Sequence, residues 1–156
     1  MIQLSIAKCL KLKNRRVGRL SKVQDDIQTY NSVLKEQENK VDVPGLTKQR
    51  DEIADCLIVL KTSIMRANQK IQEDLIRMGE LKAKASWIKE IPVRDGKERH
   101  GYQNTEVEWV AVLKKKDIDA ESKNLEVAID KLQDKIDEYN YSTKIEVDQR
   151  TLDLAS

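Results

Sequence analysis

The fold is decided by residues 46–81, LTKQRDEIADCLIVLKTSIMRANQKIQEDLIRMGEL. Apolar residues recur there mostly at intervals of three, four or seven, which is the spacing of one face of an α-helix. Proline and glycine stand just before this stretch, and proline fits the first turn of a helix but not its interior. We therefore expect a long helix over residues 44–85, with an apolar stripe of Leu46, Ile53, Leu57, Leu60, Ile64, Ala67, Ile71, Leu75, Met78 and Leu81.

Two further amphipathic segments flank this helix. Residues 1–41 carry a stripe at similar spacing, made of Ile6, Leu10, Val17, Leu20, Ile27, Tyr30 and Leu34. Residues 117–141 carry a third, with Asp117 at the expected N-cap, made of Ile118, Leu125, Ile129, Leu132, Ile136 and Tyr139. The short connection between the first two segments implies an antiparallel helical hairpin, and residues 117–141 add a third long helix.

Residues 86–113 have a different character. Trp87–Val93 contains β-formers and a proline, and Arg94–Lys97 has the composition of a turn. Val107, Trp109, Ala111 and Leu113 alternate with Glu108, Val110 and Val112, which is a strand pattern. These patterns predict a short β-hairpin with a polar loop around Arg94–Asn104. Because a two-stranded hairpin is marginal in water, it needs a helix or a second subunit to lie against.

Composition indicates a single mainly α-helical domain that associates as a coiled-coil-like homo-oligomer. Charged residues make up 36% of the 156 residues, aromatic residues only 4%, and there is no Phe. High charge with Leu, Ile and Val as the main apolar residues favours long helices with a narrow buried stripe. One copy of such a chain buries too little apolar surface, so we expect self-association. Residues 142–156 form a polar tail in which residues 143–147 allow a short extended piece.

Basic residues are concentrated at the amino-terminal end. Residues 1–24 contain seven Lys or Arg and no acidic residue, whereas residues 117–156 contain eleven Asp or Glu and five Lys or Arg. Arg15, Arg16 and Arg19 therefore form a candidate anion site, since a guanidinium suits planar bidentate contacts with phosphate. The alternative is that these charges serve solubility and pair with the acidic third helix.

A second candidate site lies in the predicted hairpin. Arg94, Arg99, His100 and Tyr102 belong to its loop, and Trp109 follows in the second strand. A tryptophan ring can stack on a base or a sugar, so charge and stacking could converge there on one ligand. The alternative is that the tryptophan packs on the helices and that the loop residues are solvated.

The sequence contains no recognisable catalytic constellation. It has one histidine, no Gly-rich phosphate loop and no closely spaced metal ligands, so we expect no enzymatic activity, no metal and no cofactor. Cys9 and Cys56 lie in apolar helical patterns and are interpreted as packing residues in a reducing cytosol. Since no apolar run approaches about 18 residues and no signal peptide is present, we expect a cytoplasmic protein in a bacterial host cell and no membrane partner.

Several segments resemble the septicolysin-like family of small bacterial and phage helical proteins, over most of residues 1–141. They are MIQLSIA at residues 1–7, LKTSIMRAN at 60–68, EVEWV at 106–110 and IDEYNY at 136–141. Met65 stands where the family usually has Asn, Glu108 where it has Lys, and Asp137 and Tyr141 where it has Gln and Trp. The resemblance implies a fold much more than an activity.

The leading hypothesis is a non-enzymatic, homo-oligomeric binding protein for a small anionic ligand, plausibly a nucleotide. Phages use small helical oligomers to sequester host signalling nucleotides, and this analogy favours a sequestering role. A structural or adaptor coiled coil that binds another protein is the second hypothesis. Weak nucleic-acid binding through the basic end is the third. Neither the ligand nor the number of subunits follows from the sequence.

Overall fold

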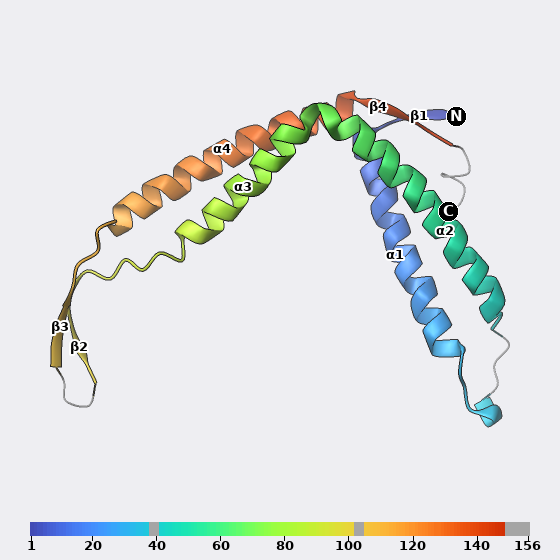
Figure 1. Cartoon of the computed structure of the whole chain (residues 1–156), viewed down its shortest axis with the longest axis horizontal. Coiled ribbons are helices and arrows are strands. Elements are labelled where there is room, and N and C mark those ends of the chain that lie inside the picture. The colour runs from blue at the N-terminus through green and yellow to red at the C-terminus, as the bar shows by residue number, and fades with distance from the viewer. Residues whose placement is uncertain (38–40, 102–104, 149–156) are drawn as a thin grey trace. The chain divides into compact units, whose positions relative to one another are not determined.

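The computed structural model describes residues 1–37, 41–101 and 105–148 (Figure 1). Within these residues the chain is mainly helical and has two small sheets of two strands each. This confirms the mainly α fold class predicted from the stripes. No described helix combines the length and the apolar character needed to cross a bilayer.

Two compact units make up the chain. One contains Met1–Lys70 and Asp137–Ser156, and the other contains Ile71–Ile136. In chain order, the described elements are β1 Ile2–Ser5, α1 Ile6–Tyr30, the 3-10 turn η1 Lys35–Gln37, α2 Val43–Asn68, the 3-10 turn η2 Gln69–Ile71, α3 Gln72–Ile88, β2 Gly96–His100, β3 Thr105–Trp109, α4 Lys115–Ser142 and β4 Lys144–Val147. Because α4 crosses residue 137, it contributes to both units.

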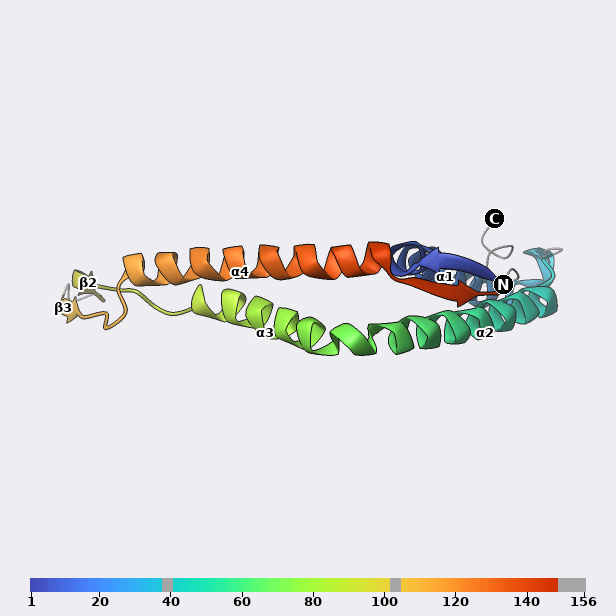
Figure 2. The same ribbon diagram turned by 90° about the horizontal axis from the view of Figure 1, so that it is seen from above.

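In the first unit, α1 and α2 lie side by side and run in opposite directions (Figures 1 and 2). Ser5 caps α1, because its hydroxyl accepts a hydrogen bond from the Lys8 amide at 3.3 Å. Asp42 caps α2 in the same way and accepts from the Gly45 amide at 3.0 Å, with a proline in the first turn. The predicted antiparallel hairpin of the first two helices is therefore present.

Two apolar clusters hold α1 against α2. One lies toward the start of α1 and is made of Ile6, Cys9, Leu12, Leu60, Ile64 and Val147. The other lies toward the end of α1 and is made of Val23, Ile53 and Leu57, with Leu20, Ile27 and Leu46 packed against it. Each fully buried side chain of this kind contributes roughly 1.5–3 kcal/mol. Most of the stabilisation of the first unit therefore comes from this helix pair.

The sheet of the first unit joins the two ends of the chain. β1 and β4 are antiparallel, and their register places Ile2 opposite Val147 and Ser5 opposite Lys144. The Ile6 amide continues this pairing, because it donates to the Thr143 carbonyl at 3.0 Å. The short extended piece allowed at residues 143–147 is confirmed as β4. Its pairing with residues 2–5, which were expected to begin a helix or to precede one, was not foreseen.

In the second unit, α3 and the first part of α4 lie beside each other (Figure 2). Their shared cluster is made of Ile88, Ile118 and Leu125, with Leu81, Ala85, Ile91 and Val93 packed against it. Long polar side chains complete the pairing, with Lys84 Nζ 2.6 Å from Glu121 and Lys135 Nζ 2.7 Å from Asp74. An exposed ion pair such as Lys84–Glu121 contributes about 0–1 kcal/mol, so the apolar cluster is the main link.

The prediction of one helix over residues 1–41 was wrong at both ends. α1 begins at Ile6 and ends at Tyr30, where its cap Asn31 still has α-helical backbone angles. The stripe was also partly misplaced, because Val17, Tyr30 and Leu34 are exposed whereas Cys9, Leu12 and Val23 are buried. The reason is that Cys9, Arg16 and Val23, spaced by seven, share the face toward α2, and a charged residue was not counted as part of a buried stripe.

The prediction of one helix over residues 44–85 was right in its stripe but wrong in its continuity. Ile53, Leu57, Leu60, Ile64, Ile71 and Met78 are all buried. A 3-10 turn at Gln69–Ile71 nevertheless separates α2 from α3, and α3 continues to Ile88. The interruption contains neither proline nor glycine, so local composition did not indicate it. The interruption lies at the boundary between the two units. Buried residues of the stripe before it belong to the first unit, and those after it belong to the second.

The first strand of the predicted hairpin was placed too early. Trp87 and Ile88 end α3, and the strand is Gly96–His100, within the stretch predicted as a loop. Gly96 at φ +100° begins this strand and Gly101 at φ +75° follows it, which are conformations that favour glycine. The second strand is confirmed only for Thr105–Trp109, because residues 110–113 pair with no described strand.

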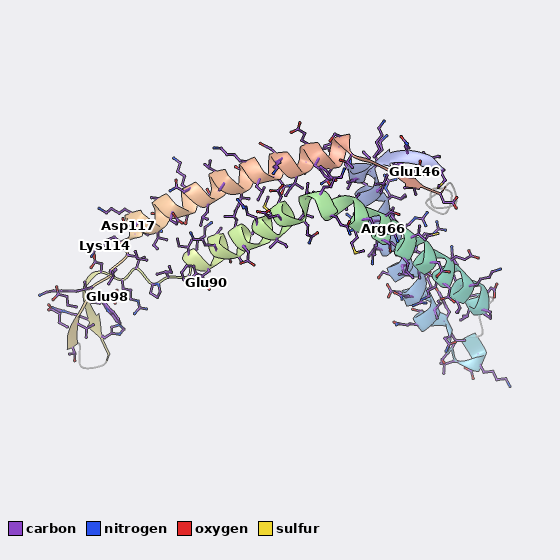
Figure 3. The ribbon with its side chains drawn as sticks, turned by 45° about the horizontal axis from the view of Figure 1, so that its top comes forward. Arg66, Glu90, Glu98, Lys114, Asp117 and Glu146 are labelled. Carbon is purple, nitrogen blue, oxygen red and sulfur yellow. The ribbon has the colours of Figure 1, made fainter. Side chains whose placement is uncertain are left out.

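The start of α4 also differs from the prediction. α4 begins at Lys115, so Asp117 lies inside its first turn and is not the N-cap. Its carboxylate accepts a hydrogen bond from the Lys114 amide at 3.0 Å, which satisfies a donor that the helix leaves free. Figure 3 shows Lys114 and Asp117 together at this end of α4. The acidic residue was correctly associated with the helix start, but it is the third residue of the helix and not the residue that precedes it.

Candidate anion-binding groove

A basic groove lies along the first turns of α1. It has a volume of about 350 Å³ and is lined by Leu4, Lys8, Lys11, Leu12 and Arg15. Lys8, Lys11 and Arg15, here called the groove cations, bring three positive charges to it. The two leucines provide an apolar floor. None of the described residues that line the groove is acidic, so the groove favours an anion.

Local structure explains why these side chains converge. Lys8, Lys11 and Arg15 are separated by three and four residues, which places them on one face of α1. Ser5 sets this face, because it fixes where the helix begins. Leu4 joins the groove from β1, which is held by its pairing with β4. The groove therefore depends on the β1–β4 sheet as well as on the helix.

The groove cations have no partners among the described residues. The side chains of all three form no ion pair with a described residue. In the grooves beside α4 several cations are paired, for example Lys115 with Asp119 at 2.8 Å and Lys135 with Asp74 at 2.7 Å, and carboxylates are part of the lining. The positive charge of the α1 groove is therefore uncompensated by this part of the chain, which leaves it open to an anionic ligand.

The three arginines predicted near this end have three different environments. Arg15 lines the groove and is exposed. Arg16 is only 1% exposed and is directed away from solvent, between the two clusters of α1 and α2. Arg19 is half-buried and already interacts within the chain. Of the predicted set, Arg15 alone belongs to the open groove.

Lys8 and Lys11 were not chosen as site residues from the sequence. The signal was present, because their spacing from Arg15 is that of a helix face with an apolar neighbour at Leu12. The spacing did not predict that Leu4 lines the groove. Leu4 forms part of the floor only because residues 2–5 are a strand. The groove could therefore be predicted as a stripe of charge but not as a cavity.

The hairpin brings together three of the residues predicted there. The Arg94 guanidinium carbon lies 5.2 Å from the centre of the Trp109 ring, within the range of a cation–π contact. The His100 ring lies 6.4 Å from the same ring at an interplanar angle of 66°. Since Arg94 already covers Trp109, the ring offers less stacking surface than the sequence suggested. Tyr102 lies outside the described residues.

Arg99 does not join this group. It is opposite Glu106 in the β2–β3 register, and neighbouring residues of a strand point to opposite faces. Arg99 is therefore on the other face from His100. All described residues of β2 are exposed, and Figure 3 shows Glu98 on this open hairpin. The residues predicted in the hairpin therefore do not all share one face of it.

Asp95 attaches the segment that carries Arg94 to the segment before α4. Its carboxylate accepts from Lys114 Nζ at 2.6 Å and, at 3.5 Å, from the Ala111 amide. The hydrogen bond with Lys114 lowers the pKa of the Asp95 carboxyl below its ordinary value of 3.8. This bond orders the base of the hairpin rather than forming a ligand site, because both of its charges are already paired.

The cysteines are placed as packing residues. Cys9 is completely buried, and burial raises the pKa of its thiol above 9.0, so the thiol stays protonated near neutral pH. Cys56 is half-buried and is likewise a free thiol. Among the described residues, no group of three or more His, Cys, Asp or Glu is arranged to hold a metal ion.

Comparison with known proteins identifies no relative. No family model matches the chain, and no curated protein or solved structure matches it. The resemblance to the septicolysin-like family therefore stays a prediction from its short segments. The function has to be argued from the residues of the chain itself.

Proposed function

We propose that this chain is a non-enzymatic, homo-oligomeric binding protein that holds a small phosphate-bearing ligand, such as a nucleotide, in the α1 groove. The observation that supports this most is the set of three groove cations, which have an apolar floor and no paired carboxylate among the described residues. Phosphate oxygens would meet the cations, and the base or sugar would cover Leu4 and Leu12. Holding a nucleotide without converting it would be sequestration, the role that the phage analogy favours.

The expected affinity is moderate. A hydrogen bond between a charged donor and phosphate contributes roughly 1.5–3 kcal/mol where it is partly buried. Two or three such contacts, reduced by the entropy lost on binding, correspond to dissociation constants on the order of micromolar. Because the groove is open to solvent, binding should weaken as salt is raised.

Calorimetry against linear and cyclic nucleotides tests the proposal. We expect binding that falls about tenfold or more in Arg15→Ala and in Lys11→Ala, since each removes a charge from the groove. Lys61→Ala is the matched control, because Lys61 is an exposed lysine of α2 outside the groove. The ligand should be recovered intact. Absence of binding by every nucleotide, or equal losses in the control, would contradict the proposal.

A second candidate function is a scaffold that binds a protein partner, including another copy of the chain. It is favoured by exposed apolar side chains on α2, namely Ile58, Val59 and Met65, which are 63%, 53% and 61% exposed. Ile58 and Met65 are seven residues apart, so they share a face that is not the face toward α1. Apolar groups left open in this way are typical of interaction surfaces.

Light scattering of the wild-type chain and of Ile58→Glu with Met65→Glu tests self-association through this face. We expect an oligomer that dissociates in the double variant while the helical content is unchanged. A monomer of 18 kDa for the wild type would exclude the homo-oligomer. If the oligomer persists in the double variant, another surface joins the subunits.

A further inference from the structure

Arg16 is buried without a partner. It is 1% exposed, and among the described residues it is the one charged side chain in the buried set. Its Nε, Nη1 and Nη2 atoms are all buried, and none has a hydrogen-bond acceptor among the described residues. Its neighbours on the same face of α1 are Leu12 and Val23, which are apolar.

This placement is unfavourable in the isolated chain. The guanidinium group of an arginine carries a positive charge in proteins. A buried charge without a counterion loses its hydration and gains nothing in return. An anion beside this guanidinium would therefore stabilise the fold.

The α1 groove lies immediately beside Arg16. Arg15, the preceding residue, lines that groove, and successive residues of a helix are rotated by about 100°. Leu12, one turn earlier, belongs both to the groove floor and to the buried cluster. Leu12 thus belongs to the groove and also to the face of α1 that carries Arg16.

We propose that Arg16 is the inner clamp of the α1 groove and binds a phosphate group with two free oxygens. On binding, its guanidinium turns past Leu12, enters the groove and donates two parallel N–H···O bonds, while the groove cations contact the outer oxygens. The anion thereby compensates the charge of Arg16, which is buried and unpaired when no anion is bound. This inference rests on the proposed function and adds the residue that couples ligand binding to stability.

Thermal unfolding of Arg16→Met without any added anion is the first test. Methionine has a similar length and no charge, so it fills the site and removes the unpaired guanidinium. We expect the melting temperature to rise by about 3–10 °C. Arg15→Met is the matched control and should leave the melting temperature nearly unchanged, because Arg15 is exposed. A fall in the melting temperature of Arg16→Met would overturn the proposal, since it would mean that the guanidinium is satisfied in the native chain.

Titration with inorganic pyrophosphate at constant ionic strength is the second test. Pyrophosphate should raise the melting temperature of the wild type, and its affinity should fall about 10- to 100-fold in Arg16→Met. Arg16→Lys should lose affinity to a similar degree without a gain in stability, because an ammonium keeps the charge but lacks the bidentate fork. This second variant keeps the test decisive if Arg16→Met does not fold.

The outcomes separate the inference from the proposed function. If Arg15→Met and Lys11→Ala weaken pyrophosphate binding but both Arg16 variants bind like the wild type, the groove binds anions and the clamp is wrong. If pyrophosphate does not bind the wild type, the proposed function fails and the clamp fails with it. If Arg16→Met instead dissociates an oligomer in the absence of anion, a carboxylate of a second copy is the partner of Arg16, and the phosphate clamp is overturned.

Discussion

The two helix pairs of this chain use charge in opposite ways. α3 and α4 share one apolar cluster, and cations of their grooves are paired with carboxylates across or along the helices. α1 and α2 share two apolar clusters, yet the groove cations on α1 have no described partners and Arg16 is buried between the clusters. Several cations of the second unit are therefore accounted for by pairing within the fold. The charge at the start of α1 is not accounted for in this way, and this contrast is why the α1 groove is the candidate functional site.

The comparison also predicts how a charge placed in the apolar stripe of each unit changes its stability. Ile64→Asp should destabilise the first unit by about 4 kcal/mol or more, because it puts an unpaired charge into a cluster in which Ile64 is buried. Ile129→Asp should cost less, about 1–3 kcal/mol, because Ile129 is only half-buried on α4.

Urea denaturation followed by circular dichroism measures both changes. Ile58→Asp is the control on α2, since Ile58 is exposed and should change stability little. Equal losses in the free energy of unfolding for Ile64→Asp and Ile58→Asp would mean that the face of α2 toward α1 is assigned wrongly.

A smaller effect is expected where α4 meets the end of α2 within the first unit. The Tyr139 hydroxyl donates to the Ala67 carbonyl at 2.7 Å in a partly buried position. Tyr139→Phe should lower the free energy of unfolding by about 1 kcal/mol, the net contribution of one such bond. Tyr141→Phe provides the control, because Tyr141 is 67% exposed. Identical thermal melts for the two variants would show that the bond to Ala67 does not contribute.

The smallest effect is expected at the exposed bond between Asp95 and Lys114 in the second unit. The folded-state pKa of Asp95 is lowered, so the bond stabilises the chain above pH 3.8 and this contribution is lost as the pH falls through the folded-state pKa. Asp95→Asn should therefore be slightly less stable than the wild type at pH 7 and should match it in strong acid. Melting curves across this pH range, with a carboxyl titration of Asp95 by NMR, measure the difference. If the difference in stability between Asp95→Asn and the wild type persists unchanged at pH 2, packing and not the bond to Lys114 causes it.

Periodicity was sufficient for the helices that bury a regular stripe. Ile53, Leu57, Leu60 and Ile64 repeat at three and four residues, and any partner that covers this face must bury them. It was insufficient at Arg16, since a charged residue inside a buried face looks like an interruption of the stripe. The hairpin strands were misplaced for a related reason. β2 has no buried face, so no apolar alternation marks Gly96–His100.

By itself, the sequence determined the helical class, the faces of α2 and α3, and the concentration of positive charge near the amino terminus, because each depends on residues close together in the chain. Only the tertiary structure decided that residues 2–5 pair with residues 144–147, that Leu4 and Leu12 form the floor beneath the groove cations, and that Arg16 is enclosed without an acceptor among the described residues. Strand pairing across nearly the whole chain and burial between two helices are set by packing of distant segments. No local pattern of residues encodes either of them.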